Sequence, residues 1–184
     1  MGWLILGVLL WSGAHLMRRL APGLRARLGE GPGKGVIALA SLIGIVLMVI
    51  GYGDAAYVPV YQPPAFLRHL NWLLMLLAVI LINLQFSRGV LRTKLRHPML
   101  NAVKTWAIAH LLVRGDLASI ILFGGLFAWA LANMILINRQ QPEWTRPPRG
   151  PWWGDAIYVV ISVVVYVVVV YIHGWLGPSP FGGM

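Results

Sequence analysis

The sequence contains no cysteine. Disulfides, cysteine-ligated iron–sulfur clusters, thiolate zinc sites and covalent haem attachment through C-x-x-C-H are therefore excluded. Acidic residues are scarce too, with 5 Asp and Glu against 15 Lys and Arg. All five fall in predicted loops or at predicted helix ends, which disfavours a buried di-iron carboxylate site and an acidic proton relay. These five residues are Glu30, Asp54, Asp116, Glu143 and Asp155.

Charge of either sign is sparse, since only 11% of residues are charged while 59% are hydrophobic. A soluble domain carries about 25% charged residues. The mean hydropathy of +0.75 agrees with a membrane protein. In a soluble chain the net charge of +10 would suggest nucleic acid as the partner. Here the basic residues lie in short loops between apolar runs, so they indicate membrane topology and contact with anionic lipids, with no nucleic acid partner.

Six apolar runs predict an all-α, polytopic membrane protein, a bundle of about six transmembrane helices in one domain over 1–184. A spanning helix needs about 20 residues. The fourth run is short and polar, and we expect the others to shield it. The last is rich in β-branched residues, but its unbroken length favours a helix. The runs cover residues 2–20, 35–52, 66–86, 98–113, 116–138 and 154–176.

Every second connection between these runs is basic, namely 18–34, 88–96 and 139–149. The positive-inside rule places these loops in the cytoplasm and both termini outside. In the first run the basic residues follow the apolar stretch, which favours a retained helix over a signal peptide. No internal repeat is visible, which disfavours a transporter.

Small residues predict where helices pack closely. Gly124, Ala128 and Ala132 follow a small-xxx-small pattern, as do Ala40 and Gly44. The last run has no such ridge. We expect it to face lipid or a second copy of the chain, so an oligomer is left open.

Histidine is the main candidate for chemistry at membrane depth. His69, His97 and His173 lie at predicted helix ends, where an interfacial role is an alternative for each. His15 and His110 lie within apolar runs, and a tryptophan, Trp11 or Trp106, precedes each by four residues. That spacing puts each pair on one helical face. Both histidines are candidate metal ligands; a hydrogen bond to a neighbouring helix is the alternative.

A second polar face follows from His97, Asn101 and Lys104, at positions i, i+4 and i+7. Lys104 needs a carbonyl, a water-filled cavity or a ligand carboxylate, unless it snorkels to the cytoplasmic surface. An apolar pocket with imidazoles, aromatic rings and nearby cations suits haem b, whose propionates pair with arginine or lysine. We expect Lys104 and Arg18 to supply those cations. A quinone is an alternative ligand.

Several segments together resemble the NnrU family of small bacterial membrane proteins, linked by name to nitrite and nitric oxide metabolism. These are GAH at 13–15, YVPVYQPPAFLRHL at 57–70, RHPMLNAVKTWAIAHLLVRGDLASIILFGGLFAWA at 96–130 and HGWLGPSPF at 173–181. One departure is Arg114, where the family pattern leads us to expect asparagine. The domain is also similar to the core of the plant zeta-carotene cis–trans isomerase, a haem b enzyme of membranes.

The resemblance implies haem b, with His110 as the best-matched ligand and His15 as its partner. Trp106 and His97 would belong to the cofactor site. The alternative thiolate ligand proposed for the plant enzyme has no counterpart, because the chain lacks cysteine. By the predicted topology His15 and His110 differ in depth by about 15 Å, so this pair requires a haem plane nearly parallel to the membrane. An upright haem fits His15 with His97, or His110 with His173 or His69, better.

The leading hypothesis is a haem b protein that acts in redox chemistry or in cis–trans isomerisation of a lipophilic polyene. The alternative is a haem-free membrane factor that supports nitrite and nitric oxide respiratory metabolism. A small transporter is a third hypothesis, disfavoured by the missing repeat and the lack of buried carboxylates.

Overall fold

The computed structural model describes residues 1–177, so the last four residues of the segment at 173–181 lie outside the described residues. Among residues 1–177 the only β-type pairing is an isolated bridge between Pro59 and Asp116. The predicted all-α class is confirmed. The elements are α1 (Gly2–Leu20), α2 (Pro22–Arg27), α3 (Glu30–Gly53), α4 (Leu67–Ile82), η1 (Leu84–Phe86), η2 (Leu91–Thr93), α5 (Pro98–Leu111), α6 (Leu117–Ser119), η3 (Ile120–Gly124), α7 (Gly125–Gln140) and α8 (Trp152–Leu176).

Three helical segments in the described part of the chain are long and apolar enough to cross a membrane. They are α3, the continuous stretch Leu117–Gln140 formed by α6, η3 and α7, and α8. The other three helices of the bundle are shorter or less apolar, with 19 residues in α1, 16 in α4 and 14 in α5. The helices match the predicted runs closely, and the six-span count stays a prediction.

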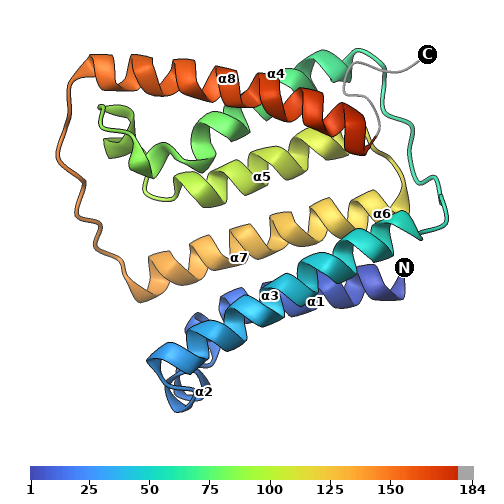
Figure 1. Cartoon of the computed structure of the whole chain (residues 1–184), viewed down its shortest axis with the longest axis horizontal. Helices are drawn as coiled ribbons and strands as arrows, with labels where there is room; N and C mark the ends of the chain where they lie inside the picture. Colours follow the sequence, from blue (N-terminus) through green and yellow to red (C-terminus); the bar gives the residue numbers. More distant parts are fainter. Residues whose placement is uncertain (178–184) are drawn as a thin grey trace.

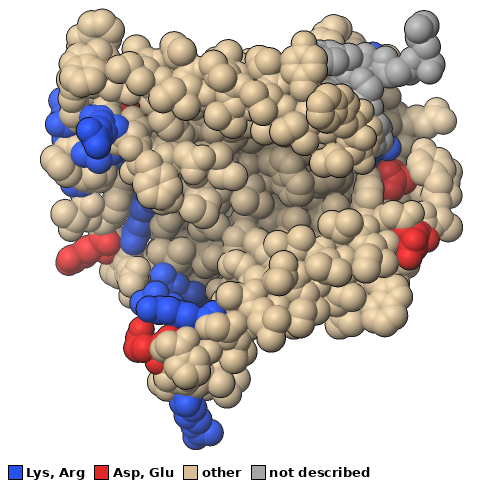
Figure 2. All heavy atoms as spheres, in the orientation of Figure 1, with Lys and Arg blue, Asp and Glu red and all other residues tan. Residues whose placement is uncertain are grey.

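The helices pack in the order α3, α1, α7, α5, α4 and α8. In Figure 1 the start of α1 and the end of α8 lie at the same end of the bundle, and α2 lies at the opposite end. Lys and Arg side chains gather mainly at the α2 end, and the surface between α8 and α3 is hollowed (Figure 2). The two outermost helices therefore flank an open furrow.

Glycines bring α1 and α3 into close contact. A Cβ atom added at Gly7 would lie 2.7 Å from both the Gly44 carbonyl oxygen and the Met48 nitrogen. One added at Gly44 would lie 2.9 Å from the Trp11 Cβ. The predicted packing role of Gly44 is thus confirmed. Backbones that approach this closely gain dispersion contacts that larger side chains would prevent.

A π-helical turn at Ile120–Gly124 interrupts the span from Leu117 to Gln140. A π turn holds an extra residue, so the residues beyond it are rotated relative to a continuous α-helix. The prediction that Gly124 forms a packing ridge is wrong, because a Cβ there would meet no atom within 4 Å. The glycine that contacts α1 is Gly125, whose added Cβ would lie 2.8 Å from the Val8 Cγ1.

At the basic end, Asp155 of α8 holds the loop between α4 and α5. Its carboxylate accepts hydrogen bonds from the backbone N–H groups of Val90 (2.7 Å) and Leu91 (3.1 Å) and from the Ser87 hydroxyl (3.2 Å). In the same region Arg96 donates to the carbonyl oxygen of Pro142 at 3.2 Å. These contacts tie two basic loops together.

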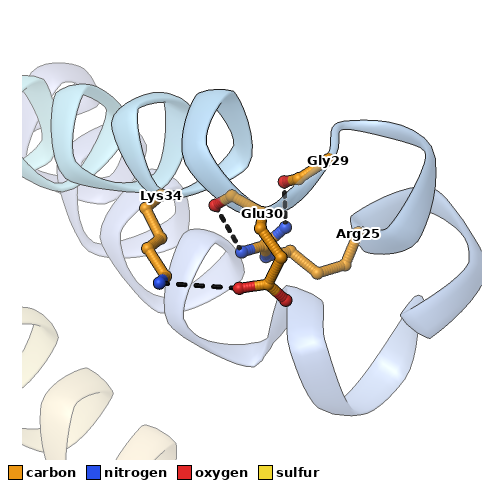
Figure 3. Close-up of polar contacts among 4 residues, drawn as sticks. All are labelled: Arg25, Gly29, Glu30 and Lys34. Atoms are coloured by element: carbon orange, nitrogen blue, oxygen red, sulfur yellow. Dashed lines mark hydrogen bonds and ion pairs between the residues drawn. The ribbon is translucent and has the colours of Figure 1, made fainter.

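The turn from α2 into α3 is built around Gly29, whose φ of 73° favours glycine. Arg25 donates to the Gly29 carbonyl oxygen at 2.7 Å and to that of Glu30 at 3.5 Å (Figure 3). The 3.5 Å ion pair between Lys34 and Glu30 is exposed, so it contributes little to stability.

The contact between α1 and α3 predicts that Gly7→Ala destabilises the bundle by about 1–3 kcal/mol, because the new methyl group meets backbone atoms of α3. Gly13→Ala is the matched control, since a Cβ at Gly13 meets no atom within 4 Å. Both variants gain the same helix propensity. Thermal unfolding in detergent should show a lower midpoint for Gly7→Ala than for Gly13→Ala; equal midpoints would contradict the packing.

Candidate functional site

A cavity of about 800 Å³ lies toward the end of the bundle that carries the termini. That volume is within the range of small-molecule and cofactor sites, roughly 300–1,000 Å³. Helices α3 and α8, which flank the furrow, both contribute to it. The lining residues are Tyr52, Pro63, Pro64, Ala65, Arg68, Asn71, Trp72, Met75, Trp106, His110, Val113, Arg114, Leu122, Phe123, Tyr166, Val169, Val170 and His173.

His110 lines this cavity with its imidazole held by a hydrogen bond within its own helix. Its Nδ1 lies 2.9 Å from the Trp106 carbonyl oxygen, so Nδ1 carries the proton and donates it there. The neutral tautomer that results leaves the Nε2 lone pair available to a metal or to a donor group. His110 is half-buried and near the last turn of α5. It is therefore oriented in the way that metal-ligating histidines are.

The π-helical turn supplies the ring that packs on His110. Phe123 is buried and stacks on the imidazole with a centroid separation of 4.4 Å and an interplanar angle of 21°. The Trp106 indole lies 5.0 Å from the imidazole and 4.9 Å from Phe123. Because π turns are frequent at functional sites, the position of Phe123 in such a turn supports a functional site in this cavity.

The cationic residues of the cavity and His173 lie near helix ends, whereas several aliphatic residues lie deeper. Arg68 begins α4, Arg114 follows α5, and His173 is in the last turn of α8. Met75, Val169 and Val170 lie farther from those ends. The cavity thus has a cationic rim and an apolar interior, which suits an amphipathic ligand with an anionic end.

The outer loops are locked together at the rim. The Gly115 carbonyl oxygen accepts the backbone N–H groups of Val60 (2.8 Å) and Tyr61 (3.0 Å), and the Leu117 N–H donates to the Val58 carbonyl oxygen at 2.9 Å. The Tyr61 hydroxyl donates to the Arg114 carbonyl oxygen at 2.9 Å. These hydrogen bonds fix the position of the residues that follow α5, including Arg114.

A buried hydrogen-bond network reaches the cavity through Tyr52. The Tyr52 hydroxyl lies 2.8 Å from the Ser119 hydroxyl, which lies 2.7 Å from Asp116 Oδ2. The Ser119 backbone N–H also donates to Asp116 Oδ1 at 2.9 Å, so Asp116 caps the helix that begins at Leu117. Ser119 and Asp116 are 0% and 6% exposed. A carboxylate just outside the span therefore orients a phenol that lines the cavity.

Burial alone would raise the pKa of the Asp116 carboxyl. The hydrogen bonds from Ser119 and the charge of Arg114 more than offset it, and the pKa lies below its ordinary value.

The other predicted site residues lie away from the cavity that His110 lines. His15 donates from Nδ1 to the Trp11 carbonyl oxygen at 2.8 Å, and its ring packs on Trp11 and Trp129. His97 Nε2 lies 2.8 Å from Asn138 Oδ1. Arg18 is exposed near the end of α1. Their roles at a cofactor stay predictions, as does the pairing of His15 with His110.

Lys104 opens into a different hollow, with Asn101 and Thr105. On α5 these residues lie on the face opposite to Trp106 and His110, given about 100° of rotation per residue. The role of Lys104 at a cofactor also stays a prediction.

The cavity has a donor set that fits haem b. Within residues 1–177 no group of three or more His, Asp or Glu residues could hold a metal ion. Haem iron needs only one or two protein ligands, and His110 and His173 line the same cavity. Arg68 and Arg114 are suited to two propionates. The aromatic and aliphatic lining suits the porphyrin ring.

The family model described as NnrU protein matches residues 3–180. The chain belongs to the NnrU family. Comparisons with curated proteins and with solved structures find no match. The resemblance drawn from the sequence is confirmed for the family, and this NnrU family member is a membrane protein by its spanning helices.

Sequence reasoning gave too little weight to several residues of the cavity. The sequence offers an interfacial role as an alternative for His173, and it does not single out Arg68, Tyr52 or Phe123 as site residues. All four lie at or near helix ends on the side of the termini or in the π turn. A shared position at one end of the predicted helices was a usable signal for the first three.

The Asp116 cap predicts a pH-dependent loss of stability. Because its pKa in the folded state is lowered, the stabilisation is present above the ordinary value of about 3.9 and is lost as pH falls through the lowered pKa. Asp116→Asn should lower the unfolding midpoint at pH 7 by about 2–4 °C, because the neutral amide loses the charge that strengthens the hydrogen bonds from Ser119, a loss of about 1 kcal/mol.

The difference between parent and Asp116→Asn should be constant from about pH 8 to pH 5 and shrink below about pH 4. Thermal unfolding followed across this range provides the measurement. Asp54→Asn is the control, since Asp54 is exposed and lies at the end of α3. A difference that already disappears between pH 7 and pH 5 would refute the assigned direction of the pKa.

Proposed function

We propose that this NnrU family member is a haem b-binding integral membrane protein that acts in redox chemistry or in cis–trans isomerisation of a lipophilic substrate. The observation that carries the proposal is the shared cavity of His110 and His173, with Arg68 and Arg114 at its rim. The resemblance to the plant isomerase supports haem independently of this geometry. A haem-free factor in nitrite and nitric oxide metabolism is the alternative outcome.

In this proposal His110 would hold the haem iron, because it lines the cavity and its Nδ1 is engaged by the Trp106 carbonyl oxygen, which leaves Nε2 as the donor nitrogen. His173 or His15 would be the second ligand. His173 is favoured by the cavity it shares with His110, and His15 by the family resemblance. Both His110 and His173 lie near the same end of the bundle, so the two would be able to hold the group together.

Bound haem would supply one-electron chemistry or a coordination position for a small ligand. The chain's own residues would hold its propionates at Arg68 and Arg114 and exclude water with Phe123, Met75 and Val169. The furrow between α3 and α8 in Figure 2 offers a lateral entry for a lipophilic molecule from the membrane. Such an entry suits a polyene better than a water-soluble substrate.

We also propose six membrane spans in a bacterial inner membrane, with both termini in the periplasm. The positively charged loops support this, because most Lys and Arg residues gather at one end of the bundle (Figure 2). Figure 1 places the start of α1 and the end of α8 at the other end. The cavity would then lie toward the periplasmic side.

Substitution of the ligands tests the haem proposal. His110→Ala should reduce the haem content of purified protein at least about tenfold. Loss of a residue that only hydrogen-bonds a metal ligand already costs about 10–100-fold in metal affinity, and loss of the ligand itself should cost at least as much. The readout is the visible spectrum normalised to protein. If no variant and no parent protein carries haem, the haem-free alternative is supported.

The second ligand is identified by the spectrum of the remaining haem. His173→Ala should leave some haem with an open position that binds carbon monoxide, whereas His15→Ala should keep the parent spectrum. The opposite pattern would assign His15, as the sequence predicts. His69→Ala is the control, because His69 is exposed and does not line the cavity.

The topology predicts that a reporter fused to the C-terminus and active only in the cytoplasm is silent. The same reporter inserted between residues 144 and 146, in the basic loop that precedes α8, should be active. Strong signal from the C-terminal fusion would exclude six spans in the proposed orientation.

A further inference from the structure

A second hollow, of about 490 Å³, lies on the far side of α5 from the histidine cavity. It is a shallow, mostly apolar depression between α4, α5 and α7. Several of its residues, including Leu77, Ile108 and Leu131, are more than one-third exposed. The lining residues are Leu77, Leu81, Leu95, Asn101, Lys104, Thr105, Ile108, Phe127 and Leu131.

Lys104 places a positive charge in this hollow with little to compensate it. The polar contact of its ammonium group is with the Met134 sulfur at 3.7 Å, and thioether sulfur is a weak acceptor. Among the residues that the structure describes, the one ion pair is that of Lys34 with Glu30. A cation at membrane depth without a partner is costly, so an anion bound near Lys104 would stabilise its charge.

The position of Lys104 indicates where that anion comes from. Lys104 lies six residues into α5, about 9 Å from Pro98 at the basic end. Asn101 and His97 lie along the same face toward that end. A lysine side chain reaches several ångströms toward the membrane surface, where lipid phosphates lie.

We propose that this hollow binds one anionic phospholipid from the leaflet at the basic end of the bundle. The phosphate pairs with Lys104 and lies beside Asn101. One acyl chain follows the apolar surface of Leu81, Ile108 and Leu131. The surrounding basic loops favour a lipid of net negative charge over a zwitterionic one, because they attract anions and repel a choline group.

This assignment and the pairing of Lys104 with a propionate exclude each other. The two hollows lie on opposite faces of α5, so one side chain serves one or the other. The assignment does not depend on haem, and it can be tested on protein with or without that group.

The experiment compares lipid retention by the full chain in detergent. Purified protein is incubated with phosphatidylglycerol or phosphatidylcholine of identical acyl chains, and bound lipid is counted by native mass spectrometry. We expect the parent to retain phosphatidylglycerol in preference to phosphatidylcholine. Lys104→Gln should reduce that retention about fivefold. Lys34→Gln, which removes an exposed charge of the same type, should leave it unchanged.

A second variant tests the shape of the hollow without changing charge. Leu131→Trp places a larger side chain in the hollow and should also reduce the retention of phosphatidylglycerol. Lys104→Arg keeps the positive charge and should retain most of the phosphatidylglycerol that the parent binds. Equal retention of the two lipids by the parent would overturn the proposal. So would equal losses in Lys34→Gln and Lys104→Gln, displacement of the lipid by inorganic phosphate, or loss of haem instead of lipid in Lys104→Gln.

Discussion

Between Leu117 and Gln140 the helix takes one π-helical turn, and the packing on either side depends on that step. Before it in the sequence, Asp116 and Ser119 form the helix cap to which the Tyr52 hydroxyl is hydrogen-bonded. Within it, Phe123 stacks on His110. Beyond it, Gly125 rather than Gly124 contacts α1. The π turn rotates the residues beyond it relative to a continuous α-helix, so it sets which glycine of α7 faces α1.

Two histidines within the apolar helices form hydrogen bonds inside their own helix. His15 and His110 each donate to the carbonyl oxygen of the tryptophan four residues earlier. The bond satisfies one ring nitrogen within the helix and leaves the other for a partner across the bundle. The same short pattern thus occurs twice, in α1 and in α5, in different surroundings. One lies beside Trp129 and the other on the large cavity.

The helices were predictable from the sequence because length and hydropathy specify them, and the predicted limits of α1 and α5 differ from the structure by at most two residues. The family and His110 with Trp106 were also predictable, from their spacing and motif. The packing face of Gly124 was not, because periodicity assumes a continuous α-helix. The position of His173 in the same cavity as His110 was one of several alternatives that depth in the membrane left open, because the choice among them depends on how α5 and α8 are placed in the bundle.

Asp155 has a consequence for the order in which the chain is assembled. Its carboxylate accepts hydrogen bonds from the backbone of Val90 and Leu91, yet it lies in the first turn of α8, the last helix within residues 1–177. The backbone of Val90 and Leu91 therefore lacks this acceptor while α5, α6 and α7 are made. Its final conformation must wait for α8 to reach the membrane, so docking of the last helix completes a loop made some 65 residues earlier.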